Sequence, residues 1–405
     1  MPQCSPAGQP DVSWTFAAAP TVGGMRIAIV TESFPPDVNG VAHSVVRAAE
    51  HLVTRGHQPL VIAPAPPGAL RRDTDRYPYP VVRIPSVPLP RYQGFRLGVP
   101  TNNRLAGVLL EHAPDVVHLA SPFVLGARAA VLAARHGLPT VAVYQTDVAA
   151  YARAYRVGWG EAAAWRRLRE IHNSARRTLA PSTRAAADLA AHGVQRVWLW
   201  RRGVDAERFH PGQRCPSLRR ALAPGGELLV GYVGRLAPEK RVELLAATAR
   251  LPGVRVVVAG DGPARRQLER DLPGVRFLGV QQGDALARLY ASLDVFVHTG
   301  PHETFGQTIQ EALASGVPVV APASGGPVDL VTPGSTGTLV PPGDEVAVAE
   351  AVAALVADAS RRQAYGLAAR AAVSGRSWAS VGDELVGHYR AARAATPVVD
   401  LPAAS

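Results

Sequence analysis

Short apolar runs and helix-periodic segments alternate along the first half of the chain. The apolar runs predict β-strands at residues 26–31, 60–63, 81–84, 116–119, 140–144, 178–180 and 197–200. Apolar positions at helical spacing predict helices at residues 41–55, 126–136, 159–177 and 183–192. The Pro- and Arg-rich segment 64–100 is interpreted as loops around the strand at 81–84. Strands that alternate with helices of this length are typical of βαβ units, so we expect a parallel sheet.

The alternation breaks at residues 201–205, and a segment containing Pro, Gly and Cys continues to residue 226. It then restarts, with strands expected at residues 228–233, 254–259, 275–278, 295–298, 317–320 and 338–340. A chain of 405 residues also exceeds what one hydrophobic core usually organises. We therefore predict two doubly wound, Rossmann-like α/β domains that face each other. In such sheets, ligands bind beyond the carboxyl ends of the strands.

These breaks place the domain boundaries. We expect a disordered extension at residues 1–24 and a first domain at residues 25–203. A second domain is expected at residues 204–375, followed by a helix at residues 376–395 that packs back on the first domain and a tail at residues 396–405. The break at Ser374-Gly375 separates the second domain from the last helical stretch.

Composition and charge narrow the class of protein. Two cysteines are too few for a disulfide framework or a cysteine metal site, which suits a reducing, cytoplasmic compartment. No run of about 18 apolar residues is present, and the first 24 residues lack the pattern of a signal peptide. The net charge of +11 is concentrated in residues 1–200, which hold 21 Arg against 12 Asp and Glu, or +9.

Such a basic half points to an anionic partner. No nucleic-acid motif accompanies the arginines, so we favour peripheral attachment to an acidic membrane surface over nucleic-acid binding. Solvated arginines without a role are the competing interpretation.

The chain has a single lysine, Lys240, in the segment Gly-Arg-Leu-Ala-Pro-Glu-Lys that directly follows an expected strand. Lysine is a compact point charge, whereas arginine is a broad planar fork. A site that keeps lysine is often one where a small cation reaches a phosphate. Arg235 and Lys240 are therefore candidates for phosphate contact, although an exposed lysine without function would look the same.

The densest polar group, residues 300–311, also leaves an expected strand and opens a helix. It contains Glu303 and Glu311, which would lie about 12 Å apart along a helix axis. A glycosidase pair needs roughly 5 to 9.5 Å, so this spacing does not favour hydrolysis by paired carboxylates. It suits a longer ligand such as a nucleotide-sugar. The backbone N–H groups around Phe305, Gly306, Gln307 and Thr308 would then face the diphosphate.

At this point a resemblance is clear. Glu303 and Glu311, the Gly-Arg-x-x-x-Glu-Lys segment and Gly-Asp-Gly-Pro resemble the signature of the retaining glycosyltransferases of family 4, which have the GT-B fold. The likeness covers nearly everything from Met25 onward. His298-Thr299-Gly300, Gly325-Gly326-Pro327 and the loop from Glu32 to Gly40 resemble the actinobacterial GDP-mannose-dependent α-mannosyltransferases that act on lipid acceptors.

The resemblance implies roles for individual residues. Arg235 and Lys240 would hold the leaving diphosphate, Glu303 would accept from hydroxyls of the donor sugar, and Glu311 from the ribose. Gly40 would let the backbone approach the donor, His118 would contact the donor sugar near the reacting carbon, and Asp261 would accept from one edge of guanine. The acceptor would lie in the first domain, with candidate contacts from Thr146, Asp147, Tyr151, Arg153 and Tyr155. The nucleotide-sugar would be a co-substrate, and no metal or redox cofactor is expected.

Competing interpretations stay open at this stage. His118 alone would more often be a packed core histidine, Glu311 a solvated helix residue, and Gly40 a turn glycine. A UDP-sugar-dependent lipid glycosyltransferase shares almost every motif. A nucleotide-sugar epimerase of the same architecture, or a binding module for anionic lipid, are further alternatives.

Overall fold

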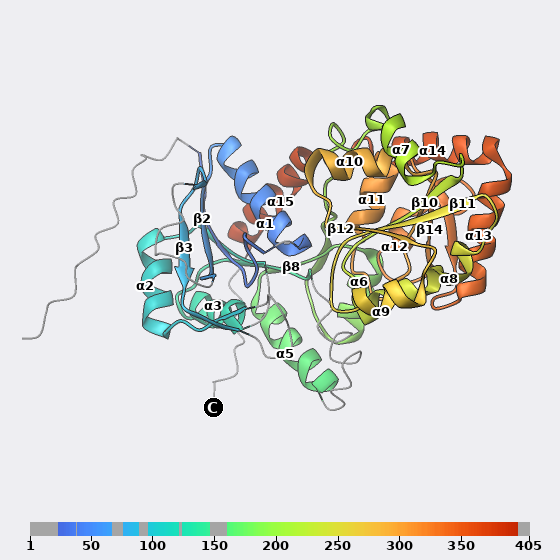
Figure 1. Ribbon diagram of the computed structural model, residues 1–405. Helices are drawn as coiled ribbons and strands as arrows, with labels where there is room; N and C mark the ends of the chain where they lie inside the picture. The colour runs from blue at the N-terminus through green and yellow to red at the C-terminus, as the bar shows by residue number, and fades with distance from the viewer. Residues whose placement is uncertain are drawn as a thin grey trace, which may run out of the picture.

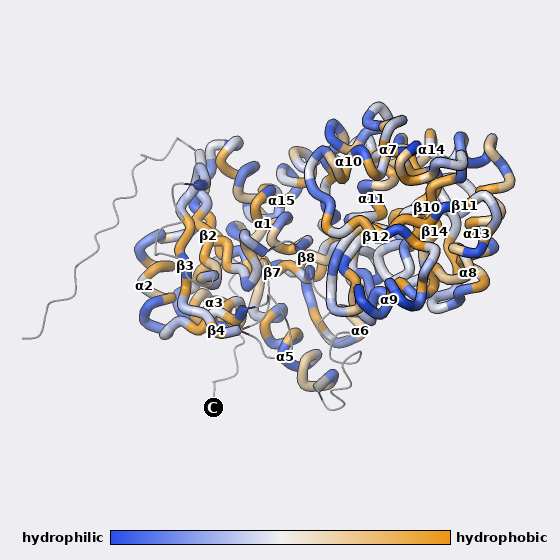
Figure 2. The backbone as a smooth tube through the Cα atoms, viewed as in Figure 1, coloured by the Kyte–Doolittle hydropathy of each residue, from blue (hydrophilic) through white to orange (hydrophobic). Residues whose placement is uncertain are grey.

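The chain folds into two α/β lobes that lie side by side (Figure 1). The structure is a computed structural model, and it describes residues 23–37, 39–66, 76–88, 96–120, 124–145 and 160–395. The two predicted sheets are both present, each parallel throughout and each within one lobe. Strands such as β2, β10 and β14 run through apolar segments of the backbone (Figure 2).

The first lobe contains a seven-stranded sheet in the order β3-β2-β1-β6-β7-β8-β9. Its strands are β1 (Arg26–Val30), β2 (Gln58–Pro64), β3 (Val81–Ile84), β6 (Val116–Leu119), β7 (Thr140–Val143), β8 (Arg177–Ala180) and β9 (Val197–Leu199). Its helices are α1 (Gly40–Thr54), α2 (Asn102–His112), α3 (Val124–Arg135), α5 (Gly160–Ser174) and α6 (Thr183–Ala191). Alternate residues of β1 bury against opposite faces, since Ile27 and Ile29 pack with α1 whereas Ala28 and Val30 pack with α2 and α3.

The second lobe contains a six-stranded sheet in the order β12-β11-β10-β13-β14-β15. Its strands are β10 (Leu228–Val233), β11 (Val254–Ala259), β12 (Arg276–Gly279), β13 (Val295–Val297), β14 (Val319–Pro322) and β15 (Gly337–Val340). Its α-helices are α7 (Pro216–Leu222), α8 (Ala246–Ala249), α9 (Arg265–Asp271), α10 (Gly283–Ser292), α11 (Gln307–Ala314), α12 (Pro327–Leu330), α13 (Glu345–Ala357) and α14 (Ala359–Val373). Short 3₁₀ helices are η2 (Pro211–Gln213), η3 (Pro238–Lys240) and η4 (Val242–Leu245).

The last helix, α15 (Trp378–Ala394), lies on the first lobe beside α1, although it follows the second lobe in the chain (Figure 1). Its buried residues Leu385 and Tyr389 belong to the same core as Ile27 and Ile29. The indole nitrogen of Trp200 donates to the carbonyl of Val381 at 3.0 Å. The chain therefore crosses between the lobes twice, near residue 203 and again near residue 376.

Two features of the first lobe were not expected from the sequence. The first is α2, in which only Leu105, Leu109 and His112 are buried, so its apolar periodicity is weak. The second is the antiparallel pair of β4 (Ser86–Pro88) and β5 (Arg96–Gly98), inside the segment interpreted as loops. Strands of only three residues, β4 largely exposed and β5 partly buried, carry little apolar alternation.

Hydrogen bonds join the lobes along one edge. Thr183, the first residue of α6, donates through its backbone N–H to Asp329 of α12 at 2.8 Å, and its hydroxyl also donates to that carboxylate. The Thr304 hydroxyl donates to the carbonyl of Gln145 at 3.2 Å. Within the described ranges, no helix is long and apolar enough to cross a lipid bilayer.

Candidate active site

The predicted donor residues of the second lobe gather at one edge of its sheet. Strands β11, β10 and β13 are neighbours in the sheet, and their carboxyl ends lead into the loops that carry Asp261, Arg235 with Lys240, and Glu303 respectively. The loops also touch each other, because Leu236 N–H donates to the carbonyl of Asp261 at 2.9 Å. The structure thus brings these loops together at the carboxyl edge of the sheet, where the sequence predicts a ligand site.

Lys240 and Glu303 form an ion pair at the centre of this edge. The Lys240 Nζ atom lies 2.8 Å from Glu303 Oε2, and both side chains are mostly but not fully buried, with 18% and 22% exposed. Burial alone would raise the pKa of Glu303, but the charges of Lys240, His298 and Arg202 outweigh it and lower the pKa to about 2. Glu303 is therefore a fixed anion at neutral pH, able to accept hydrogen bonds but unsuited to proton transfer.

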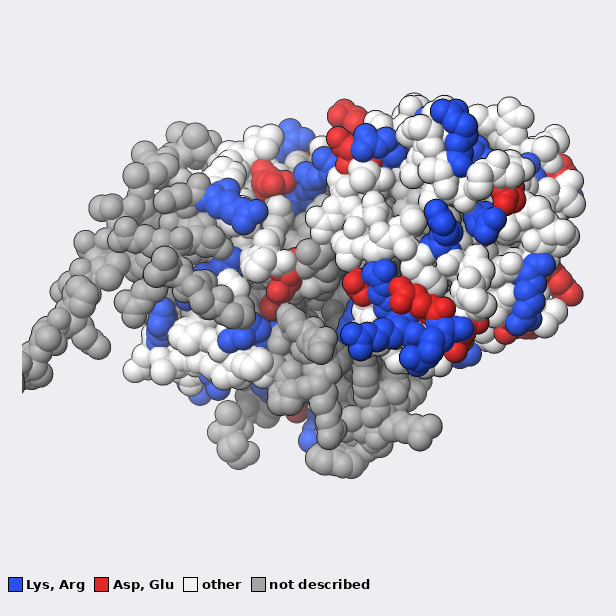
Figure 3. Space-filling view, in the orientation of Figure 1, with Lys and Arg blue, Asp and Glu red and all other residues white. Residues whose placement is uncertain are grey.

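Arg235 and Asp261 lie more openly on the same edge. Arg235 is 39% exposed, and its guanidinium lies 3.9 Å from Glu239. The Asp261 carboxylate is about half exposed and lies 3.4 Å from Arg265, which also pairs with Glu269 at 2.8 Å. Acidic and basic side chains are interspersed in this region around α9 (Figure 3). Both predicted side chains can reach a ligand without rearrangement of the core.

Helix α11 begins at the edge in a way that only glycine allows. Gly306 has φ of 102°, and a Cβ atom there would lie 3.2 Å from side-chain carbons of Ile309 and Leu330. The N–H groups of Gln307 and Thr308, in the first turn, have no hydrogen-bond acceptor among the described residues. They are available to an anion, as the sequence predicts.

Two side chains of this predicted set have another role. Phe305 is 1% exposed and packs in the core beneath the loop. The amide nitrogen of Gln307 donates to the carbonyl of Gly203 at 3.2 Å, so this side chain is tied to the link between the lobes. The side chains of these two residues thus have contacts within the protein, and the predicted role in diphosphate binding falls to their backbone.

Glu311 is a buried residue of α11, so it is not a solvated helix residue. Burial raises its pKa to about 7, and the neighbouring side chains of Tyr290 and Gln307 offset part of that effect. A carboxyl group poised near neutral pH gains ionisation when hydroxyl groups donate to it. This chemistry suits the predicted contact with ribose hydroxyls.

The first lobe contributes Gly40, at the start of α1. Asn39 caps this helix, since its side-chain oxygen accepts from the N–H groups of Val41 and Ala42 at 3.0 Å each. A Cβ atom built on Gly40 would lie 2.6 Å from Nη1 of Arg202. The absence of a side chain at Gly40 therefore leaves space that this guanidinium partly occupies.

His118 lies elsewhere, and the predicted contact with the donor sugar is not supported. Its imidazole is 1% exposed, and Nδ1 lies 2.5 Å from the hydroxyl of Tyr389 in α15. Along β6, Val116 and Ala120 point to the face covered by α1 and α15, and His118 shares that face because strand side chains alternate. Burial lowers its pKa to about 3, so it is a neutral core histidine. The sequence showed its place near a strand end but not which way the side chain points.

Sequence reasoning missed two polar residues near the Glu303 loop, Arg202 and Gln145. Arg202 donates to Gln145 Oε1 at 2.8 Å, and both side chains are 7% exposed. The charge of Glu303 acts on the Arg202 guanidinium. A usable signal was present, because Gln145 directly follows an expected strand and Arg202 lies at the break between the domains.

The predicted acceptor contacts lie outside the described residues and stay predictions; they are Thr146, Asp147, Tyr151, Arg153 and Tyr155. Of the expected extension at residues 1–24, residues 1–22 also lie outside the described part, so that expectation stays a prediction as well. Among the residues that are described, no group of three or more His, Cys, Asp or Glu is placed to hold a metal ion.

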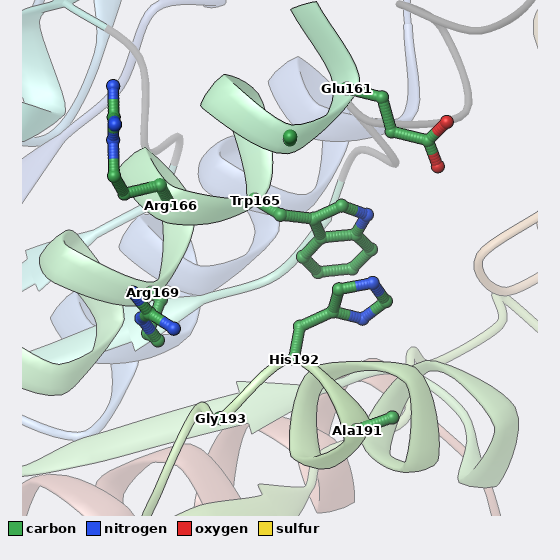
Figure 4. A pocket seen from close by; sticks show the side chains of 8 residues that line it. Glu161, Trp165, Arg166, Arg169, Ala191, His192 and Gly193 are labelled. Atoms are coloured by element: carbon green, nitrogen blue, oxygen red, sulfur yellow. The ribbon is translucent and has the colours of Figure 1, made fainter. Parts of the chain in front are cut away.

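A cavity of about 750 Å³ lies between α5 and the end of α6. Figure 4 shows Trp165 stacked on His192, with Glu161 and Arg166 on the same helix as the tryptophan. The two rings are 3.6 Å apart and nearly parallel. This cavity is lined by first-lobe residues only and does not include the Lys240–Glu303 pair.

Comparison with known proteins places this geometry in a family. The model of Glycosyltransferase Family 4 matches residues 38–208, and that of Glycosyl transferases group 1 matches residues 217–372. The chain is 51% identical to a GDP-mannose-dependent alpha-mannosyltransferase of Mycobacterium tuberculosis, over 91% of this chain and 97% of that protein. The chain belongs to glycosyltransferase family 4.

Other relatives and structures agree with this family 4 assignment. A protein of the same name from Corynebacterium glutamicum is 43% identical, over 90% of this chain and 88% of its own. In fold, the chain is similar to Anabaena HepE in complex with UDP, with a TM-score of 0.75, 22% identity, and coverage of 91% and 100% of the two chains. Sucrose-phosphate synthase of Thermosynechococcus elongatus gives a TM-score of 0.74 at 21% identity, over 90% and 98%. This protein is a glycosyltransferase with the GT-B fold.

Proposed function

We propose that this glycosyltransferase moves mannose from GDP-mannose to a lipid-linked or glycolipid acceptor, with retention of configuration, at the inner surface of the cell membrane. The likeness to the GDP-mannose-dependent enzymes, over nine-tenths of the chain, is the observation that carries the donor assignment. The Lys240–Glu303 pair and the open start of α11 supply the chemistry that such a donor needs.

The proposed role of Lys240 and Arg235 is to bind the leaving diphosphate. Negative charge grows on that group as the bond to the sugar breaks, so nearby cations stabilise the transition state more than the ground state. The free N–H groups of Gln307 and Thr308 at the start of α11 would add to this field.

Glu303 would hold the donor sugar. Its pKa of about 2 keeps it ionised, so it accepts hydrogen bonds from sugar hydroxyls and does not act as a general base. Glu311 would accept from the ribose hydroxyls at the other end of the nucleotide. The two carboxylates would thus fix the donor at both ends of the diphosphate.

Retention is best explained by departure and attack on one face of the sugar. A double displacement needs a free nucleophile, and Glu303, held by Lys240, is a poor one. In the front-face step, the bond from the anomeric carbon to the β-phosphate oxygen breaks. The acceptor hydroxyl forms the new glycosidic bond on the same face, and its proton passes to the departing phosphate oxygen.

We propose that this step needs no metal ion, because lysine and arginine supply the positive charge at the diphosphate. Treatment with EDTA followed by desalting should leave turnover within about twofold of the untreated enzyme. A loss of activity that Mg²⁺ or Mn²⁺ restores would contradict this part of the proposal.

Peripheral attachment would be made through the first lobe. Helix α5 exposes Arg166 and Arg169 beside the cavity that contains Trp165. Arginine heads beside an indole ring are groups that bind the interface of an acidic membrane. Because α5 follows the predicted acceptor contacts in the chain, this surface would bring a lipid acceptor to the first lobe.

Calorimetric titration with GDP, UDP and their mannose and glucose conjugates tests the donor assignment. We expect GDP and GDP-mannose to bind and UDP to bind at least tenfold more weakly. Binding of UDP without response to GDP would replace mannose transfer by a UDP-sugar-dependent activity. Conversion of GDP-mannose into an isomeric nucleotide-sugar, without acceptor, would instead identify an epimerase.

A further inference from the structure

Arg202 is a buried cation at the point where three segments of the site meet. It lies just before the link into the second lobe, and its side chain is 7% exposed. Its guanidinium lies beside Gly40, where a Cβ atom would clash with it, and donates to Gln145 at 2.8 Å. Gly40 and Gln145 both belong to the first lobe. Its backbone carbonyl accepts from the side chain of Gln310 in α11 at 3.0 Å. The residue is thus held by both lobes.

Within the described ranges, Arg202 forms no ion pair. Its hydrogen-bond partner Gln145 is a neutral amide, and Glu303, whose charge acts on Arg202, already holds Lys240. Burial lowers the pKa of Arg202 to about 10 and Glu303 partly restores it, so the guanidinium stays charged at neutral pH. A buried charge is costly unless a counter-charge meets it, so this position favours an anionic ligand.

The surroundings add to the positive field. Arg202 lies over the first turn of α1, where the partial positive charge of a 15-residue helix is concentrated. His43 lies in the same turn, and burial together with the charges of Arg47, Arg202 and Arg208 lowers its pKa to about 4. The positive charge of the guanidinium and the partial positive charge at the helix N-terminus repel each other. An anion bound between them would remove this repulsion.

We propose that Arg202 is a catalytic residue that contacts the outer phosphate of the leaving diphosphate from the first lobe, opposite Arg235 and Lys240 on the second lobe. This inference rests on the proposed transfer from a nucleotide-sugar. In this arrangement the first lobe places the positive charge of Arg202 next to the Gly40 backbone, close to the bond between the sugar and the diphosphate that breaks. Because Arg202 is held by both lobes, its contact with the phosphate also depends on how the two lobes are set against each other.

Variants of Arg202 and paired nucleotides test this contact. Arg202→Met removes the charge at similar length, and we expect it to weaken GDP about tenfold or more but GMP less than threefold, because GMP lacks the outer phosphate. The value of kcat/KM for transfer should fall about 10²-fold or more. Arg220→Met is the control, since Arg220 is an exposed arginine on α7 of the second lobe; it should bind both nucleotides like the unaltered enzyme.

Further measurements separate the contact from a structural role. Guanidinium ions added to Arg202→Ala should restore part of the GDP affinity and turnover, and Arg202→Lys should bind GDP within about threefold of the unaltered enzyme. A Met variant that lowers the melting temperature but keeps the ratio of GDP to GMP affinity would overturn the proposal. An unchanged GDP affinity with a raised acceptor KM would also overturn it, by assigning the arginine to the acceptor.

The donor assignment and this inference fail separately. If the unaltered enzyme binds UDP and not GDP, the mannose proposal fails, and the same comparison is made with UDP and UMP. If it binds neither diphosphate, both proposals are wrong.

Discussion

The Nζ atom of Lys240 lies 2.8 Å from Oε2 of Glu303, so the single lysine of the chain is joined to the loop that follows β13. The pair crosses between two neighbouring strand ends, those of β10 and β13. The ion pair thereby fixes one carboxylate and one ammonium in position. Preorganised charge of this kind costs no reorganisation when the reaction occurs.

Removing the ammonium should mainly lower turnover. Lys240→Ala and Arg235→Ala are each expected to reduce kcat about 10²-fold or more, because each cation would stabilise charge that develops on the leaving diphosphate. The matched control is Arg241→Gln, since Arg241 adjoins Lys240 but is 43% exposed and pairs with Glu243. Steady-state kinetics with saturating donor gives the comparison. Near-normal turnover in either alanine variant would remove that residue from the site.

Glu311 should make nucleotide affinity depend on pH. Burial raises its pKa to about 7, so it is largely protonated at pH 6 and largely ionised at pH 8. If the anion accepts from ribose, the Kd for GDP should fall by about tenfold between these values. Titrations at several pH values should show this slope in the unaltered enzyme and lose it in Glu311→Gln.

The control in this experiment matters because Glu32 is also buried, with its pKa raised to about 7 by burial. The Glu32 carboxylate instead accepts from the N–H groups of Gly98 and Leu125. A slope that survives in Glu311→Gln would therefore point to Glu32 or another group and would count against the ribose contact.

The contact between His118 and Tyr389 predicts an effect on stability and not on chemistry. Tyr389→Phe removes the hydroxyl partner and should lower the free energy of unfolding by about 1 to 2 kcal/mol, with kcat within twofold. Because burial lowers the His118 pKa to about 3, the unfolded chain takes up a proton near pH 6.5 before the folded chain does. The stability that neutral His118 provides is thus present above pH 6.5 and is lost as the pH falls towards 3. Urea unfolding at two pH values and a turnover assay check both statements.

The sequence predicted the fold well where apolar periodicity was strong. The runs at 81–84, 116–119, 228–233 and 254–259 have the bounds of β3, β6, β10 and β11. It failed at α2 and at the β4–β5 pair, which bury few side chains and so carry little pattern. Periodicity reports burial, so elements that bury few side chains are hard to detect from the sequence.

The site was predictable only as far as strand ends identify it. Lys240 and Glu303 follow neighbouring strands, and parallel strand ends meet at one edge. The direction of a side chain within a strand needs the register of the whole sheet, and this is why the sequence did not show that His118 packs against Tyr389. The position of Arg202 at the break between the domains was a usable signal, but its contacts depend on how the two lobes meet, and this relation leaves no periodic pattern in the sequence.

Asp329 should couple the two lobes energetically. Its carboxylate, 5% exposed, accepts from the backbone and hydroxyl of Thr183, at the start of α6 in the other lobe. In a double-mutant cycle of Asp329→Asn and Thr183→Val, urea unfolding should give a coupling of about 1 kcal/mol or more. Asp344→Asn is the control, because Asp344 caps α13 within its own lobe. It should destabilise the protein without coupling to Thr183, and equal coupling in both cycles would contradict the interlobe contact.

The basic surface of α5 should decide whether the enzyme binds acidic membranes. Arg166 and Arg169 are both exposed, and each arginine near an acidic surface contributes roughly 1 kcal/mol of binding. Reversing both charges to Glu should weaken binding to equimolar phosphatidylglycerol and phosphatidylcholine vesicles about 10- to 100-fold in a sedimentation assay. The same reversal at Arg266 and Arg270, exposed on α9 of the second lobe, alters the net charge equally and should leave binding nearly unchanged.

Binding should also decrease as salt rises from about 0.05 to 0.5 M, because the Debye length shortens. Equal loss in the two double variants would show a response to net charge alone, and salt-independent binding would show that α5 does not act through its arginines.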